Sequence, residues 1–162
     1  MKKVLSVLLT IVLVATFALF ALGSSDSETT TDGDQGSGAA DNTVLGSYTV
    51  EIMSCRLAKD YEDKPVAIIK YKFTNNDDEP ASFMIAFEDN AYQNGVGLNE
   101  TVFLDDSANY SSDDQMKEIK KGASLELEIA YDLNDTTTDI EVEVKESFSF
   151  DDKIVKKPFS IA

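Results

Sequence analysis

The fold of this chain is decided by the segment Ser124–Tyr131, which reads Ser124-Leu125-Glu126-Leu127-Glu128-Ile129-Ala130-Tyr131. Apolar side chains occupy every second position from Leu125 to Tyr131, and glutamates stand at two of the positions between them. Successive side chains of a β-strand point to opposite faces of a sheet, so one face of this segment is apolar and the other is charged. The segment therefore predicts a half-buried strand with Leu127 and Ile129 in the core.

The same alternation recurs along the chain, and turn-forming residues separate the runs. Phe148 and Phe150 precede an Asp151-Asp152 turn, after which Lys153–Ile161 can close a sheet. No long amphipathic helical pattern is present. The other predicted strands are Tyr48–Ile52, continued by Met53–Leu57, then Val66–Phe73, Ser82–Phe87 and Ile140–Val144.

The first predicted strand changes phase by one residue between Ile52 and Met53. Before this point the apolar positions end at Ile52, and after it they are Met53, Cys55 and Leu57. A β-bulge, or a strand that passes from one sheet to another, produces such a slip. We expect Cys55 to be a small core residue that does not react in the native state.

Asn94-Gly95 lies between the strand-like runs Ala91–Gln93 and Val96–Leu98. Both residues tolerate positive φ, so the pair predicts a two-residue type I′ hairpin. Tyr92, Asn94 and Gly95 form a possible recognition tip, because exposed aromatic residues on loops often bind partners. A plain connector with Tyr92 packed on the sheet is the alternative.

Seven to nine short strands separated by regular turns predict an all-β domain, for which an antiparallel Ig-like β-sandwich fits best. A small barrel is the alternative. The predicted domain covers residues 45–162. Residues 24–44 hold Ser, Thr, Asp and Gly with almost no bulky apolar side chain, a composition typical of a disordered tether.

The N-terminus predicts export. Lys2 and Lys3 precede an uncharged, mostly apolar run of 19 residues, Val4–Leu22, and a polar stretch follows. Residues 1–23 fit either a signal peptide cleaved before Ser24 or an uncleaved membrane anchor, since the run reaches the length of a spanning helix. No Cys follows the run to accept a lipid. The predicted location is extracellular or on the cell envelope, with the membrane touched only through residues 4–22.

Composition excludes several classes of protein. The net charge is −16 and Arg56 is the one arginine, so nucleic acid is excluded as a partner. The absence of histidine excludes nucleophilic catalysis with a His base and the usual zinc and copper sites. One cysteine allows no internal disulfide, and the absence of tryptophan weakens a sugar-stacking surface.

Acidic side chains offer two further readings. The loop Asp105–Asp114 has oxygen ligands for a weak Ca²⁺ site but no EF-hand spacing, so we expect a solvated loop and no metal or cofactor. A hydrolase based on paired carboxylates needs a set separation across a cleft. Four glutamates fall on outward strand positions, where they keep a sheet soluble and discourage edge pairing: Glu126, Glu128, Glu141 and Glu143.

Seven segments together carry a resemblance to a known family: Arg56–Tyr61, Phe73–Asn76, Glu79–Phe83, Tyr92–Val96, Gln115–Lys120, Ala130–Asp135 and Phe148–Asp152. From about Thr49 to Phe159 the chain resembles a bacterial family of exported domains with no established activity. The resemblance implies an Ig-like sandwich related to the secreted immunoprotective-antigen type, and it carries over no catalytic residue. Many members look like lipoproteins, whereas this chain lacks the lipid-accepting Cys.

The sequence therefore predicts a non-enzymatic exported module with a binding role. Its partner would be an extracellular or envelope protein or a glycan. A carbohydrate-binding module and a carboxylate-based hydrolase are the alternatives. The absence of His and of any catalytic motif argues against the hydrolase.

Overall fold

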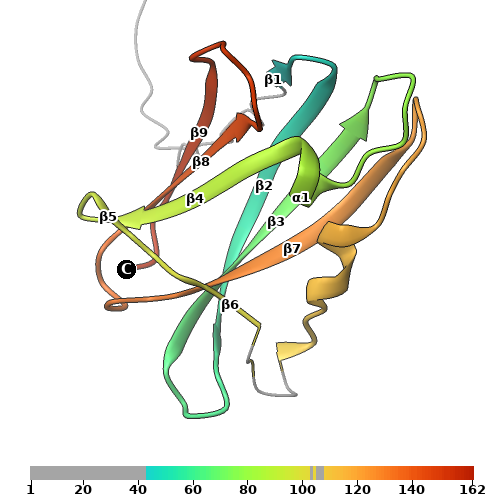
Figure 1. Cartoon of the computed structure of the whole chain (residues 1–162). Coiled ribbons are helices and arrows are strands. Elements are labelled where there is room, and N and C mark those ends of the chain that lie inside the picture. The colour runs from blue at the N-terminus through green and yellow to red at the C-terminus, as the bar shows by residue number, and fades with distance from the viewer. Residues whose placement is uncertain (1–42, 103, 105–107) are drawn as a thin grey trace, which may run out of the picture. The chain divides into compact units, whose positions relative to one another are not determined.

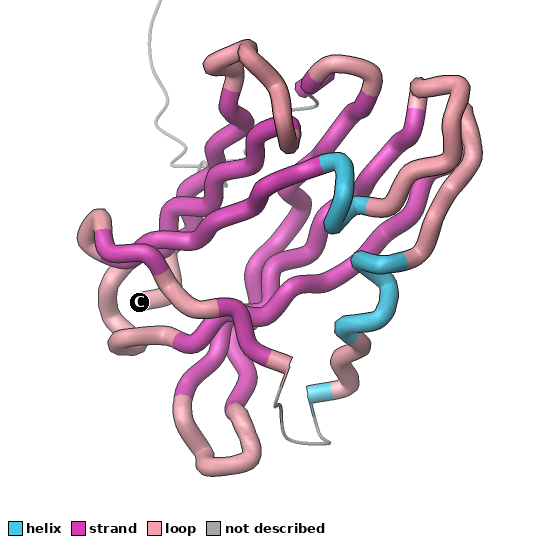
Figure 2. The backbone as a smooth tube through the Cα atoms, viewed as in Figure 1, coloured by secondary structure: helices cyan, strands magenta, loops and turns pink. Residues whose placement is uncertain are grey.

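A computed structural model describes residues 43–102, 104 and 108–162, and these residues form an all-β fold with two antiparallel sheets. The five-stranded sheet has the order β1-β2-β3-β7-β6, and the four-stranded sheet has the order β5-β4-β8-β9 (Figures 1 and 2). Its elements are β1 (Thr43–Leu45), β2 (Tyr48–Lys59), β3 (Pro65–Asn75), α1 (Phe83–Ala86), β4 (Phe87–Gln93), β5 (Val96–Gly97), β6 (Glu100–Thr101), the 3₁₀ helix η2 (Ser112–Met116), β7 (Ser124–Asp132), β8 (Ile140–Glu146) and β9 (Ile154–Phe159).

The two sheets are interleaved along the chain. The chain builds β1–β3 in the first sheet, β4 and β5 in the second, β6 and β7 in the first, and β8 and β9 in the second. One core cluster unites the apolar faces of both sheets, with Tyr71 and Ile129 from one and Ala91 and Val142 from the other. Each sheet thus buries its apolar face against the other.

Strand β7 confirms the prediction made from its alternation. It pairs with β3 from Ser124 to Asp132, and Leu127 and Ile129 are 1% and 0% exposed. Glu126 and Glu128 face outward, where Lys70 and Arg56 respectively form ion pairs with them, at 2.6 Å and 2.8 Å. The apolar positions drive the strand into the core, and the glutamates keep the opposite face solvated.

The phase slip in β2 is a β-bulge, one of the two explanations predicted for it. The register with β3 shifts between Ile52 and Ser54, which leaves Met53 as the extra residue. The Lys157 ammonium of β9 donates hydrogen bonds to the carbonyl oxygens of Ile52 and Met53, at 2.8 Å and 2.9 Å. This lysine therefore satisfies backbone groups at the bulge and links β2 of the five-stranded sheet to β9, an edge strand of the four-stranded sheet.

The apolar set predicted after the bulge is only partly buried. Cys55 packs against the core as a half-buried residue, but Leu57 is 47% exposed, so its predicted inward position is wrong. β1 pairs only with residues 48–50 of β2. The second half of β2 therefore lies beyond β1, and Leu57 has no β1 residue beside it.

The strand predicted over Ser82–Phe87 is also wrong in its first part, because Phe83–Ala86 form the short helix α1. The carbonyl oxygen of Ser82 accepts hydrogen bonds from the N–H groups of Ile85 and Ala86. Phe83 and Ala86, three positions apart, are buried, whereas Ile85 is 65% exposed. Spacing of three residues places side chains on one face of a helix, so burial here follows helical spacing rather than alternation.

The Asn94-Gly95 hairpin between β4 and β5 is confirmed. Gln93 pairs with Val96, and the two turn residues have φ of 51° and 73°. Both values lie in the left-handed region that the predicted type I′ turn requires.

The first described strand, β1, starts at Thr43, two positions before the predicted domain boundary at Leu45. The predicted signal or anchor, residues 1–23, and all of the predicted tether up to residue 42 lie outside the described residues. Within the part of the chain that the structure describes, no helix has the length and apolar character needed to cross a membrane.

Candidate binding face on the four-stranded sheet

The outer face of the four-stranded sheet carries polar and aromatic side chains at alternate positions. Glu88, Asn90 and Tyr92 lie on this face of β4, while Phe87 and Ala91 of the same strand belong to the core. On β8 the same rule places Glu143 and Lys145 outside and Val144 inside. The face is thus a direct product of the alternating sequence.

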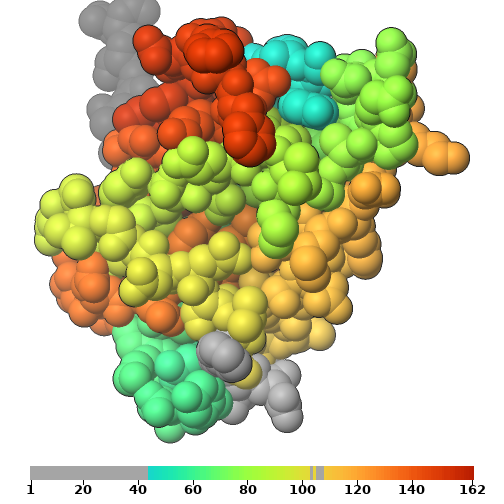
Figure 3. Space-filling model, viewed as in Figure 1, coloured from blue at the N-terminus to red at the C-terminus, as the bar shows by residue number. Residues whose placement is uncertain are grey.

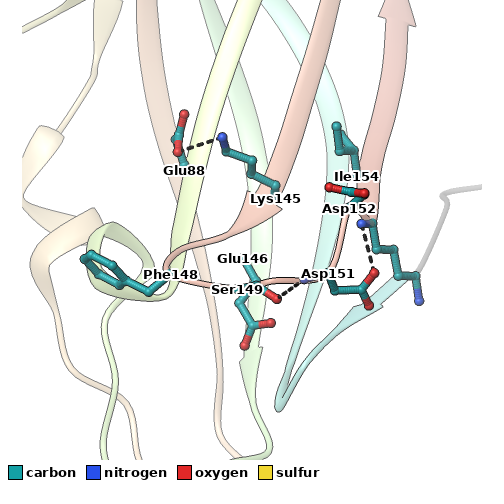
Figure 4. Close-up of a pocket in the computed structure, with 9 residues that line it drawn as sticks. Glu88, Lys145, Glu146, Phe148, Ser149, Asp151, Asp152 and Ile154 are labelled. Atoms are coloured by element: carbon teal, nitrogen blue, oxygen red, sulfur yellow. Dashed lines mark hydrogen bonds and ion pairs between the residues drawn. The ribbon is translucent and has the colours of Figure 1, made fainter.

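Two adjoining hollows mark this face. The larger, of about 300 Å³, extends from Glu88 and Lys145 into the loop that joins β8 to β9 (Figure 4). The smaller, of about 130 Å³, includes Asn90 and Tyr92. Glu88, Lys145 and Ile154 line both hollows, so the two form one continuous surface from Tyr92 to the loop.

The strand part of this surface is neutralised by ion pairs. Lys145 lies 2.9 Å from Glu88, and the two side chains point toward one another in Figure 4. Lys156 of β9 forms ion pairs with Glu143 and Glu141.

The four glutamates considered for a hydrolase all have cationic partners: Glu126, Glu128, Glu141 and Glu143. The hydrogen bond from Lys70 lowers the pKa of Glu126. A general acid needs a raised pKa, which such a partner opposes.

The loop Ser147–Lys153 presents two bare aromatic rings. Phe148 is 96% exposed and Phe150 is 106% exposed. In the space-filling view the orange-red loop stands out beside the cyan residues of β1 and the β1–β2 turn (Figure 3). Phe148 also has a φ of 57°, a backbone conformation that bulky residues rarely adopt.

Hydrogen bonds fix the shape of this loop at both ends. The Ser147 N–H donates to the carbonyl oxygen of Ala86 in α1 at 2.9 Å. The Asp151 N–H donates to Ser149 Oγ, and the Lys153 N–H donates to Asp151 Oδ1. The Lys153 ammonium reaches the carbonyl oxygen of Val44 in β1 at 2.7 Å. The rings are therefore displayed from a built loop rather than from a loose end.

Sequence reasoning missed this loop as a site, because it assigned Phe148 and Phe150 to the approach of a turn. The sequence contains only a weak signal: both aromatic residues follow the alternating run Ile140–Val144 and stand beside serines and the Asp151-Asp152 pair. Apolar residues in such a polar stretch have no strand partner against which to pack.

The predicted recognition tip is divided by the structure. Asn94 and Gly95 are exposed at the hairpin turn. Tyr92 is half-buried on the outer face of β4, next to Gly97 of β5, and lines the smaller hollow with Glu88 and Asn90. Tyr92 thus belongs to the face, and the recognition role of the three residues stays a prediction.

A second polar cluster lies between the sheets. The Tyr131 hydroxyl donates a hydrogen bond to Asp89 of β4, and it lies 3.2 Å from the hydroxyl of Tyr71. Burial raises the pKa of Asp89 to about 6 and raises the pKa of both tyrosines. Asp89 shares the inward phase of Phe87 and Ala91, so this carboxyl points away from the outer face.

Two candidate sites from the sequence remain, the thiol of Cys55 and the acidic loop Asp105–Asp114. Burial raises the pKa of the Cys55 thiol to about 11, which suppresses the thiolate. No group of three or more His, Cys, Asp or Glu residues suited to a metal ion occurs among the described residues. Residues 105–107 of the loop Asp105–Asp114 lie outside them.

Comparison with known protein families identifies the family of this chain. A model described as "Domain of unknown function (DUF5067)" matches residues 23–146. The chain belongs to the DUF5067 family. This match ends with β8, so the Phe148–Phe150 loop and β9 follow the matched residues. No curated protein matches this chain.

Two solved structures share its fold. A presumed lipoprotein from Staphylococcus aureus subsp. aureus NCTC 8325 aligns with a TM-score of 0.55 and 18% identity, over 76% of this chain and 94% of its own. A protein from Enterococcus faecalis, solved by NMR, aligns with a TM-score of 0.54 and 17% identity, over 74% of this chain and 88% of its own. At these identities the likeness establishes the fold.

Proposed function

We propose that this DUF5067 protein is a non-enzymatic binding module, an Ig-like β-sandwich exported to the cell envelope or the exterior. Export is supported by the basic and apolar pattern of residues 1–23 and by the likeness to the presumed staphylococcal lipoprotein. The Ig-like assignment is supported by two antiparallel sheets that share one core.

The observation that carries the binding role is the pair of fully exposed phenylalanines on a hydrogen-bonded loop. An exposed phenyl ring forgoes the favourable free energy of burial, and aromatic residues are enriched where proteins meet partners. The larger hollow, which Phe148 lines, connects the loop to the polar outer face of the four-stranded sheet, and this face supplies hydrogen-bonding groups.

A carbohydrate-binding role is the second candidate, because Tyr92 lines a small polar hollow beside Asn90 and Glu88. A tyrosine face can stack on a sugar ring, and amide and carboxylate groups can bond its hydroxyls. This reading places recognition at Tyr92 instead of at the loop.

Envelope binding tests both readings. The full chain with a C-terminal tag would be expressed in a Gram-positive host, and protease treatment of intact cells would report whether the tag is outside. Envelope fractions would then be titrated with the wild type, Phe148→Ser/Phe150→Ser and Tyr92→Ala. We expect external exposure and saturable binding that the double variant loses.

The control is Leu57→Ser/Val102→Ser, which removes two apolar side chains that are 47% and 49% exposed away from the loop and from Tyr92. Loss of binding in Tyr92→Ala alone would favour the carbohydrate reading. An internal tag, or the absence of saturable binding in the wild type, would overturn the proposal.

A further inference from the structure

We propose that the loop Ser147–Lys153 binds a segment of another protein, and that this segment carries lysine or arginine side chains next to apolar ones. This inference rests on the proposed binding role and specifies the chemistry of the partner. It is drawn from the composition of the loop and from the contrast between its charges and those of the neighbouring strands.

The apolar part of the surface extends from the loop to α1. Phe148 and Phe150 are fully exposed, and Met84 and Ile85 of α1 are 47% and 65% exposed. The hydrogen bond from Ser147 to Ala86 holds the base of the loop against α1. In Figure 4 the Phe148 ring lies beside this helical turn and points away from Glu88 and Lys145. A partner can therefore contact side chains of both elements together.

Within the part of the chain that the structure describes, the carboxylates in and beside the loop form no ion pair, whereas many strand carboxylates do. Glu88, Glu126, Glu128, Glu141 and Glu143 each have a Lys or Arg partner.

By contrast, Glu146, Asp151 and Asp152 have no ion-pair partner among the described residues. The two cations beside them are engaged, Lys145 with Glu88 and Lys153 with the Val44 carbonyl. The surface at the loop thus combines exposed rings with carboxylates that form no ion pair with any cation of residues 43–102, 104 and 108–162.

Charge complementarity selects the partner. The three carboxylates and the net charge of −16 attract a basic segment. This attraction favours its encounter with the protein and orients it at the loop. A second copy of the chain brings the same negative charge, and an anionic lipid surface repels it. A cationic segment with apolar side chains satisfies both parts of the surface at once.

Selection from a random peptide library displayed on phage tests this inference. The full chain would be immobilised through a C-terminal tag, and phage would be depleted on Phe148→Ser/Phe150→Ser before selection on the wild type. We expect the enriched peptides to combine Lys or Arg with aromatic or aliphatic residues. Their affinity should fall at least about tenfold in the double variant, which corresponds to 1.4 kcal/mol.

The contribution of charge is tested with Asp151→Asn/Asp152→Asn. We expect this variant to weaken binding of a selected peptide and to reduce its salt dependence. The matched control, Glu118→Gln/Asp139→Asn, removes two exposed carboxylates elsewhere and should leave the affinity unchanged. Equal weakening in both variants would mean that only net charge matters, and would overturn a site at the loop.

Three other outcomes would overturn the inference: no enrichment, enrichment of acidic or wholly polar peptides, or a loop-dependent contact with another class of partner. Vesicles of phosphatidylcholine with and without phosphatidylglycerol probe lipid, and sedimentation probes self-association. A loss in the double variant in either assay would assign the loop to a membrane or a second copy. If wild-type envelope binding persists while the peptide selection fails, the binding role stands and only the partner chemistry is wrong.

Discussion

Replacing Asp89 with Asn should make the protein more stable at neutral pH. Asp89 is half-buried on the side of β4 that faces the other sheet, and its carboxyl accepts a hydrogen bond from Tyr131 of β7. Burial raises its pKa from 3.8 to about 6. The folded protein therefore holds this proton more tightly than the unfolded chain does, and ionisation of the buried group opposes folding.

The difference between the two pKa values sets the size of the effect. One pKa unit corresponds to about 1.36 kcal/mol, so the shift amounts to at most about 3 kcal/mol. Its contribution to stability is fully present below about pH 4 and is lost as pH rises through about 6. An Asn side chain keeps an acceptor for the Tyr131 hydroxyl and carries no charge at any pH.

Urea unfolding of the wild type and Asp89→Asn from pH 4 to pH 8 measures this effect, since the difference between them removes the other titrating groups. We expect near-equal free energies of unfolding at pH 4 and an advantage for the variant that grows to at most about 3 kcal/mol by pH 7. Tyr131→Phe removes a donor that favours the ionised carboxyl, and should therefore move the change to higher pH. A difference that is constant with pH, or a variant less stable than the wild type at pH 7, would refute the reasoning.

Three further predictions concern the core, the thiol and the bulge. Leu127→Ala should lower the free energy of unfolding by about 2–5 kcal/mol in a urea titration, because this side chain is 1% exposed; a loss under about 0.5 kcal/mol would contradict the burial. Cys55 should react with a thiol reagent at pH 7 much more slowly in the native state than in urea, because its pKa is raised to about 11, and equal rates would show that the thiol is open to solvent. Lys157→Met should cost about 1–3 kcal/mol by leaving two carbonyl groups at the bulge without their donor, whereas Lys120→Met at an exposed position should stay within about 0.5 kcal/mol, and equal losses in both would remove the special role of Lys157.

The sequence was most informative where burial and backbone period act together. Leu127 and Ile129 could be placed in the core because alternation repeats over a whole strand. The bulge after Ile52 could be located because a one-residue slip exchanges the two faces. Asn94-Gly95 fixed a turn through backbone sterics, which are local and do not depend on the rest of the fold.

Other features depend on tertiary neighbours that a pattern does not contain. Ile85 alternates with Phe83 and Phe87 in sequence, and over so few residues helix and strand periods are hard to separate. Leu57 continues an apolar phase, but it lies on the part of β2 beyond β1 and does not pack against the core cluster. Phe148 and Phe150 look like core residues until the end of β8 is known. The inward positions of Phe87 and Ala91 did indicate that Asp89, which lies between them on the same face of β4, points toward the core.

The interleaving of strands bears on how this protein can be divided. Each sheet contains strands from two separate stretches of the chain, and β4 and β5 of one sheet lie between β3 and β6 of the other. No single cut in the chain therefore separates the two sheets, because one fragment always retains strands of both. Neither sheet can serve as an independent unit of folding or of genetic recombination, and the domain should be gained or lost in evolution as a whole.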